Sequence, residues 1–309
     1  MSNRYGLYSA FFDDGATGLA LPQVRSLGTR TNKGMVTFHP SGSIDPAAHV
    51  MSTARPILSL ATHDLATVFG SVSISAGYYC PDGARFLYRR RVPGGAFSSS
   101  SDHTAQTVES GFLHCTEISA DAESQDAANC ALEFIALSAD GGNPFAVTDD
   151  QSIHADLPAP AYVSSFFMGP VYFNSVLLPG LIRARVRPGI GFQSRLCDGG
   201  SFPRETASSI NSRNPAIELE FLKVDMLDSV IGDIMCAAYS NTLAVYFQKG
   251  STNNEGRVAA ATAEHIKVSS AAGSWGADDV SVSGEDDATL TLLVQPTGTL
   301  ALSAASAIP

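Results

Sequence analysis

An internal repeat limits the folds open to this 309-residue chain more than any other feature of the sequence. In the first part of each half, Pro22 recurs as Pro179 and Gly34 recurs as Gly191, in each case 157 residues later. Further matches are Gly42 with Gly199, Pro46 with Pro203, His103 with His265 and Gly111 with Gly273. Glycine and proline mark turns and special backbone angles, which a chance match between two apolar strands would not supply. The repeat predicts two copies of one structural unit.

The limits of the two units follow from the repeat and from one short segment between them. Residues 157–161, Leu-Pro-Ala-Pro-Ala, have the composition of a short stiff linker. We therefore expect a first β domain over residues 1–156 and a second over residues 162–309. The spacing of the later matches is 162 instead of 157, as between His103 and His265, which indicates a small loop insertion.

Each half has the sequence pattern of strands. Residues 217–221 (Ile-Glu-Leu-Glu-Phe) alternate apolar and charged side chains, as a half-buried strand does. The same parity predicts that Leu290, Leu292 and Val294 are buried in one half and Cys130, Leu132 and Phe134 in the other. Residues 72–75 and 280–283 also alternate, and predict further strands.

One short helix is expected in each half, over residues 63–69 and 224–231, each followed by a glycine that ends it. The sequence therefore predicts a mostly β protein. It consists of two tandem β-sandwich or open-barrel units, each with one short helix packed across it.

Charge and cysteine content exclude several classes of protein. The chain has 19 Lys and Arg against 30 Asp and Glu, a net charge of −11. Such a chain is poorly suited to grip nucleic acid, because that affinity grows with the number of phosphates neutralised. Five cysteines without a CxxC pair indicate free, mostly buried thiols. The chain has no apolar run of the roughly 18 residues that a membrane helix needs, and its first residues do not resemble a signal peptide.

Motifs for catalysis are missing from the sequence. It contains no GxSxG, HExxH, GxxxxGK[ST] or GxGxxG pattern, and its seven histidines are scattered singly. The acidic segments 13–15 and 284–287 lack the ligand spacing of a calcium loop and are interpreted as turns. We expect no enzymatic activity, no cofactor and no bound metal.

Two basic clusters are candidate contact sites. Arg89, Arg90 and Arg91 are consecutive, whereas Arg183, Arg185 and Arg187 are spaced so that a strand would point all three the same way. The second group fits a row of ion pairs across a subunit interface, since guanidinium groups clamp carboxylates well. A solvated strand face is the alternative, and the sequence leaves both interpretations open.

The order of strands and turns resembles a bacteriophage major tail protein, the kind that forms the tail tube. In the second half the resemblance rests on residues 262–273, the strand 280–283, the turn 284–287 and the strand 288–294. The first half has the same order over residues 86–95, 101–103, 108–111, 118–119 and 128–134. The resemblance covers most of both halves but includes no catalytic signature.

This resemblance implies a β-sandwich with a flanking helix, in rings that stack into a hollow tube through which the genome travels. A duplicated subunit would allow three chains to form a pseudo-six-fold ring. The implied partners are other copies of this chain as a homotrimer, other tail proteins, and viral DNA that passes without specific binding. The implied location is the virion tail, assembled in the host cytoplasm, with no membrane partner.

The resemblance also suggests roles for the basic residues. Arg89, Arg90 and Arg91, with their counterpart Lys249, are expected at the contact between stacked rings. The row Arg183, Arg185 and Arg187 is expected at inter-subunit ion pairs and away from the channel, because a channel for DNA should not attract phosphates.

Two other classes stay open. One is another virion component with a duplicated β-sandwich: a tail tip or hub protein, a capsid or decoration protein, or an adhesin. The other is a carbohydrate-active or hydrolytic β-sandwich enzyme, which would need a pair of carboxylates facing each other in a cleft.

Overall fold

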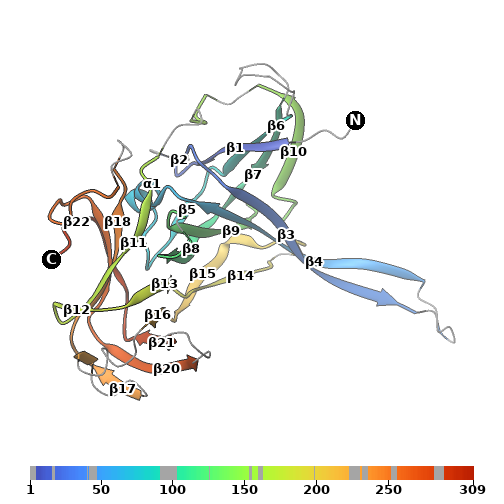
Figure 1. Ribbon diagram of the computed structural model, residues 1–309. Helices are drawn as coiled ribbons and strands as arrows, with labels where there is room; N and C mark the ends of the chain where they lie inside the picture. The colour runs from blue at the N-terminus through green and yellow to red at the C-terminus, as the bar shows by residue number, and fades with distance from the viewer. Residues whose placement is uncertain are drawn as a thin grey trace.

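The protein is almost entirely built of antiparallel strands in the computed structural model (Figure 1). The structure describes residues 5–15, 18–39, 41, 47–90, 103–124, 126–152, 155–158, 163–197, 199–222, 230–231, 236–251, 256–281 and 289–309. The mostly β fold predicted from the sequence is confirmed.

Among the described residues, the first half of the chain contains ten strands and the helix α1. Their bounds are β1 (Tyr5–Phe12), β2 (Leu19–Leu21), β3 (Ser26–Phe38), β4 (Ala48–Thr62), α1 (Leu65–Ser71), β5 (Tyr78–Cys80), β6 (Ala84–Arg90), β7 (His103–Val108), β8 (Ser110–Asp121), β9 (Asn129–Leu137) and β10 (Phe145–Gln151).

In the described part of the second half, twelve strands follow. They are β11 (Phe166–Phe173), β12 (Val176–Leu178), β13 (Leu181–Arg187), β14 (Ile190–Arg195), β15 (Arg204–Arg213), β16 (Ala216–Leu222), β17 (Cys236–Tyr239), β18 (Leu243–Lys249), β19 (His265–Ser270), β20 (Gly273–Ser281), β21 (Thr289–Pro296) and β22 (Ala301–Ser306).

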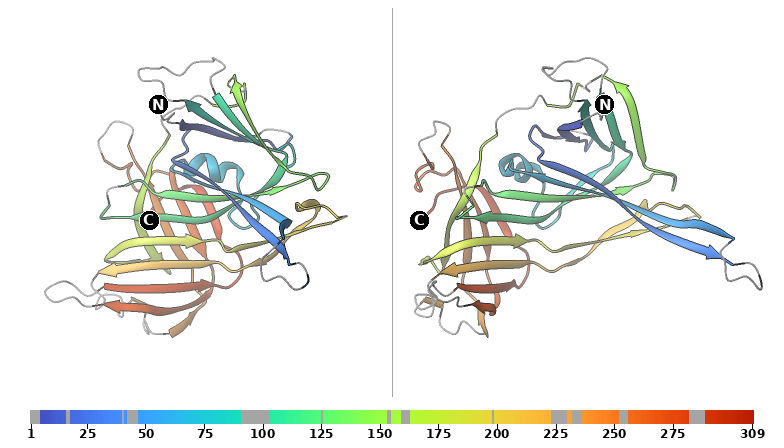
Figure 2. Two further views of the ribbon diagram at one scale, coloured as in Figure 1. Left: turned by 90° about the vertical axis from the view of Figure 1, so that its right-hand side faces the viewer. Right: turned by 45° about the vertical axis from the view of Figure 1, so that its right-hand side comes forward.

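Three large sheets form the body. One long sheet of ten strands has the order β17-β20-β21-β16-β13-β8-β9-β4-β3, with β5 beside β8. Two five-stranded sheets, β10-β7-β6-β1-β2 and β12-β11-β18-β19-β22, lie against one face of it, and the strands of the second cross behind those of the long sheet (Figure 2). A fourth, two-stranded sheet pairs β14 with β15.

The strand order of the first half recurs in the second. The two five-stranded sheets match strand for strand, with β1, β2, β6, β7 and β10 in the places of β11, β12, β18, β19 and β22. In the long sheet, the run β3-β4-β9-β8 with β5 beside it matches the run β13-β16-β21-β20-β17. The strands β3 and β4 are long enough to correspond also to β14 and β15.

The pairing registers match as well, and two of their bulges recur at equivalent places. The β8–β9 ladder has a bulge between Cys115 and Glu117, and the β20–β21 ladder has one between Ala277 and Asp279. The β3–β4 hairpin has a bulge after Gly34, and the β14–β15 hairpin has one after Gly191. Since a bulge shifts the register at one defined residue, these matches assign each strand residue a counterpart in the other half.

A single apolar core runs through both halves, between the long sheet and the five-stranded sheets. In the first half, Phe12 packs against Phe86 and Phe134 with ring centroids 5.5 and 5.6 Å away. In the second half, Trp275 packs against Phe173 and Tyr239, both at 4.9 Å. The two halves therefore share one sheet and one core, although their strands fall on either side of the expected linker.

Most local predictions hold where the residues are described. The sets Cys130, Leu132, Phe134 and Leu290, Leu292, Val294 are buried, as the alternation predicts. Helix α1 starts after Asp64, whose carboxylate accepts a hydrogen bond from the Thr67 N–H, and it ends at Ser71. The expected strand over residues 72–75 is wrong: this segment is a tight turn, in which the Ser73 hydroxyl accepts the N–H of Ser75 and of Ala76.

The second expected helix, over residues 224–231, lies largely outside the described residues. Val230 and Ile231 are helical, and Ile231 is buried in the shared core.

Candidate functional site

The row Arg183, Arg185 and Arg187 lies on the face of the long sheet opposite the two five-stranded sheets. On β13 these side chains alternate with Ala184 and Val186, which are fully buried on the opposite face. The structure thus brings the three guanidinium groups to one side of the strand, as their spacing predicts.

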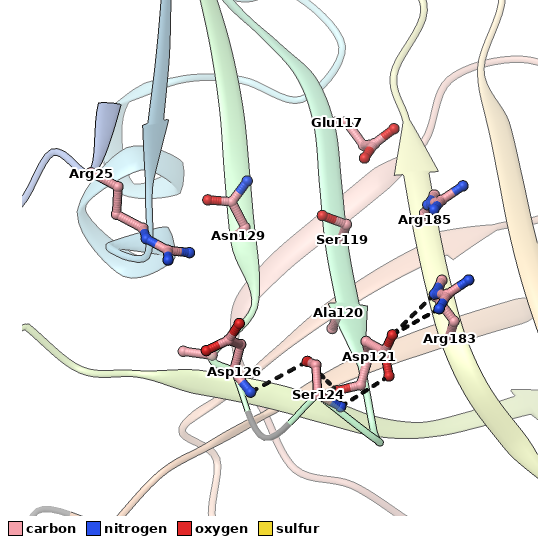
Figure 3. A pocket seen from close by; sticks show the side chains of 11 residues that line it. Arg25, Glu117, Ser119, Ala120, Asp121, Ser124, Asp126, Asn129, Arg183 and Arg185 are labelled. Carbon is pink, nitrogen blue, oxygen red and sulfur yellow. Dashed lines mark hydrogen bonds and ion pairs between the residues drawn. The ribbon is translucent and has the colours of Figure 1, made fainter. Parts of the chain in front are cut away.

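Carboxylates of the two neighbouring strands hold every member of the row. Arg183 donates from Nε and Nη2 to Asp121 Oδ2 at 3.1 and 3.0 Å (Figure 3). It also donates from Nη1 to Glu220 Oε2 at 2.7 Å. Arg185 donates to Glu218 at 2.8 Å. Arg187 contacts Glu117 at 3.0 Å and Glu218 at 3.2 Å.

These ion pairs connect the two halves of the same chain. Asp121 and Glu117 lie on β8 of the first half, and Glu218 and Glu220 lie on β16 of the second. From the sequence, these arginines were expected to form ion pairs with another subunit, and inter-subunit pairing remains a prediction. It did not identify the four carboxylates, although Glu218 and Glu220 have the same two-residue spacing as the arginines.

The pKa shifts of Arg183, Arg187 and Asp121 favour their charged forms. The hydrogen bond to Asp121 raises the pKa of Arg183, and the hydrogen bond to Glu117 raises the pKa of Arg187. For Asp121, burial acts to raise the pKa, but the N–H groups of Glu123 and Ser124 and the Arg183 guanidinium together lower it below its ordinary 3.8. The arginines are therefore neutralised by paired carboxylates and not by deprotonation.

We expect the variant Asp121→Asn to lose part of the acid sensitivity of folding. Because the folded pKa of Asp121 is lowered, its contribution is present above pH 4 or so and is lost as the pH falls through the folded pKa. The pair is partly exposed, so the contribution is about 0.5 kcal/mol. Urea unfolding at pH 7 and pH 3 measures it: the difference between the wild-type and variant curves should be smaller at pH 3 than at pH 7. A difference that is equal at both pH values would contradict the assignment.

An open polar hollow of about 370 Å³ lies beside this network, between the ends of β8 and β9 and the row. Arg25, Asp126 and Asn129 line it together with Asp121 and Arg183. The two carboxylates of an acid–base pair would have to face each other across a cleft, whereas Asp121 here is bound to Arg183. The hollow is a depression in a paired charged surface.

The residues predicted at the ring-to-ring contact lie at the ends of equivalent strands. Arg89 and Arg90 are the last residues of β6, and Arg91 lies outside the described residues. The registers make Lys249, at the end of β18, the counterpart of Arg90. The Lys249 ammonium donates to Glu264 at 2.7 Å. Their role between rings remains a prediction.

The edge strand β3 of the long sheet is the counterpart of β13, which is paired on both sides inside the sheet. Within the chain, the outer edge of β13 pairs with β8, from Arg183 opposite Asp121 to Val186 opposite Ile118. The counterpart of β13 is β3, which is the last strand of the sheet. Thr29, the counterpart of Val186, is exposed, whereas Val186 is fully buried.

At the opposite end of the sheet, part of β20 has no partner strand among the described residues, although the equivalent part of β8 is paired. On β8, the first residues pair with β5 and the last residues pair with β13. On β20, the first residues pair with β17 in the same way, but no strand among the described residues pairs with the segment from Ala277 to Ser281 on that side. A long unpaired strand edge is a ready template for pairing with another chain.

The structure also describes the acidic segment 13–15 and all five cysteines. The Asp13 and Asp14 carboxylates accept the N–H groups of Gly15 and Gly18, which fits the predicted turn, and residues 284–287 lie outside the described part. All five cysteines are free, and Cys80, Cys115 and Cys130 are buried. Within the described ranges, no three His, Cys, Asp or Glu side chains are grouped so that they could hold a metal ion.

No helix in the described part of the chain is both long and apolar enough to cross a membrane.

Comparison with known proteins gives no family. No protein-family model matches this chain, and no curated protein matches it in sequence.

Proposed function

We propose that this protein is a structural subunit that assembles, edge to edge, into rings that stack as the hollow tail tube of a bacteriophage. We further infer that the chain is an internal duplication, with units over residues 1–156 and 162–309. The observation that carries the proposal is the β8–β13 junction, since the same two edges recur unpaired as β20 and β3.

The junction inside the chain specifies how two copies would join. Transferring its register through the repeat places Gly28 of one copy opposite Ser281 of the next, as Arg185 lies opposite Ser119. The two surfaces are different, so the contact is heterologous, and such contacts form a closed ring where the rotation permits. Three copies would give six units around one ring, which is the trimer that the sequence resemblance implies.

Closure also fixes which face lines the channel. The five-stranded sheets occupy one face of the long sheet, and this bulky layer fits best on the outside, where the circumference is larger. The channel wall is then the opposite face, which carries the row Arg183, Arg185 and Arg187. This arrangement replaces the expectation that the row avoids the channel, and the paired carboxylates explain how arginines are tolerated beside DNA.

Electron microscopy of the purified protein, with mass measurement of the smallest assembly, tests the proposal. We expect hollow tubes built of rings, with a trimer as the repeating unit. Closed shells or isolated trimeric knobs would instead favour the alternative of a tip, capsid, decoration or adhesin protein. A chain that stays monomeric at high concentration would contradict assembly altogether.

A further inference from the structure

The hairpin β14–β15 of the second half covers a surface of the first half. Phe192 stacks on Phe112 of β8, with ring centroids 4.4 Å apart and planes 7° apart. Further along the hairpin, Glu205 accepts a hydrogen bond from the Tyr79 hydroxyl at 2.7 Å. The chain therefore contains one complete example of a hairpin arm docked on a neighbouring unit.

The tip of the same hairpin fits beside the end of β9. The Ser138 N–H donates to the carbonyl of Pro203 at 2.8 Å, and the Arg204 guanidinium donates to the Ala139 carbonyl at 2.9 Å. On the other side, the Ala54 N–H of β4 donates to the Ser201 carbonyl at 2.8 Å. The tip is thus held between β4 and the segment after β9.

No described residue packs on the equivalent surface of the second half as Phe192 does on the first, and this surface is hollowed in two places. One hollow of about 240 Å³ is lined by Cys236, Ser274, Trp275, Gly276, Leu293 and Gln295, and we call it the socket. Ser274 is the counterpart of Phe112, so a small side chain stands where the first half has an aromatic ring. A second hollow of about 550 Å³ lies beside Pro296 and Gly298, and Gly298 is the counterpart of Ser138.

The equivalent arm of the first half extends away from the body without a partner. It is the outer part of the β3–β4 hairpin, which projects beyond the rest of the molecule (Figures 1 and 2). The bulges after Gly34 and Gly191 make Met35 the counterpart of Phe192. Met35 is 54% exposed, and Val36, Phe38 and Val50 are exposed near it. This concentration of exposed apolar side chains on one projecting arm indicates a contact surface.

We infer that the β3–β4 arm of one copy docks on the second half of the next copy, with Met35 inserted into the socket. The inference rests on the proposed ring, because edge pairing of β3 with β20 brings the base of the arm beside the socket. Size supports the match: a flexible methionine fills an irregular gap where Ser274 has replaced the stacking ring of Phe112. The occupant is a second copy of this chain.

Cross-linking with a short bis-maleimide tests the contact. Met35→Cys introduces a thiol at the arm, and the native exposed Cys236 supplies the other thiol in the socket. We expect a ladder of linked chains on a denaturing gel and a peptide joining positions 35 and 236 by mass spectrometry. Val36→Cys is the matched control, because neighbouring strand residues point to opposite faces. It should give at least about tenfold less of the link, and Met35→Cys/Cys236→Ser should give none.

A second variant separates docking from edge pairing. Met35→Asp should raise the apparent dissociation constant of the ring at least about tenfold, the loss expected when one apolar anchor is removed. Its circular dichroism and melting temperature should match those of the wild type, since Met35 is exposed in the single chain. Rings of Met35→Cys that give no 35–236 link, or a Met35→Asp variant that assembles normally, would overturn this inference while the ring stands. A wild-type chain that never assembles would overturn the proposed function itself.

Discussion

A proline at the free edge of β3 should give a chain that folds and does not form rings. Gly28 and Thr29 are adjacent on this edge strand, and both are exposed. Backbone N–H groups of neighbouring strand residues point to opposite sides, so one of the two faces the open edge and the other faces β4. Proline removes the N–H, and edge strands tolerate it where that N–H faces solvent.

We therefore expect different results from Gly28→Pro and Thr29→Pro. The proline whose N–H faced outward should leave a stable monomer that is blocked at the β3–β20 contact. The other should lower the free energy of unfolding, because it removes a β3–β4 hydrogen bond. The space around Gly28 is open, with nothing within 4 Å of an added Cβ, so a steric clash inside the chain does not complicate that variant.

Analytical ultracentrifugation and urea unfolding of both variants measure these effects. The control is Gly28→Ala, which keeps the N–H and should assemble like the wild type. If both proline variants fold with wild-type stability and still form rings, β3 is not the assembling edge. The proposed ring would then need a different contact.

The fold was predictable from sequence where a local pattern decides it. Alternation gave the buried sets on β9 and β21, and Gly34 and Gly191 marked positions that the structure shows as matching bulges. The segment 72–75 was misread because its serines satisfy the same alternation as a strand, whereas their hydroxyls form a local turn. Short polar alternation does not distinguish these two outcomes.

The contacts that matter for function depend on pairings distant in sequence. The carboxylate Asp121 lies 62 residues from Arg183 and meets it because β8 and β13 are neighbours in the sheet. The row was expected between subunits, and the structure places its partners within the chain. Similarly, Met35 has no motif of its own, and its significance comes from its register with Phe192. Strand order, which a single sequence specifies weakly, decides both.

Removing the carboxylates that hold the arginine row should turn a surface that does not retain DNA into one that does. The substitutions are Glu117→Gln, Asp121→Asn, Glu218→Gln and Glu220→Gln. Each keeps the size of the side chain while the guanidiniums of Arg183, Arg185 and Arg187 lose their neutralising partners. Three free arginines can neutralise about three phosphates, which predicts that the logarithm of the DNA affinity falls with the logarithm of salt with a slope of about −2.7.

Fluorescence anisotropy with a duplex of random sequence, at several salt concentrations, measures this change. At 0.15 M salt the wild type should show no detectable binding to DNA. At 0.05 M salt the fourfold variant should bind the duplex at least about tenfold more tightly than the wild type does. A control variant with the same gain in net charge neutralises four exposed carboxylates away from the row: Asp82, Glu109, Asp149 and Asp278.

The control separates a general charge effect from the release of the row. If both fourfold variants bind DNA equally, net charge alone explains the change. The ion pairs are then not what prevents the arginines from binding DNA. If only the variant at the row binds, the exposed face of the long sheet is a basic surface held neutral by its own carboxylates. In assembled tubes the same variant should then retain DNA in the channel, because the row faces inward in the proposed ring. Tubes of this variant that release DNA as freely as the wild type would place the row outside the channel.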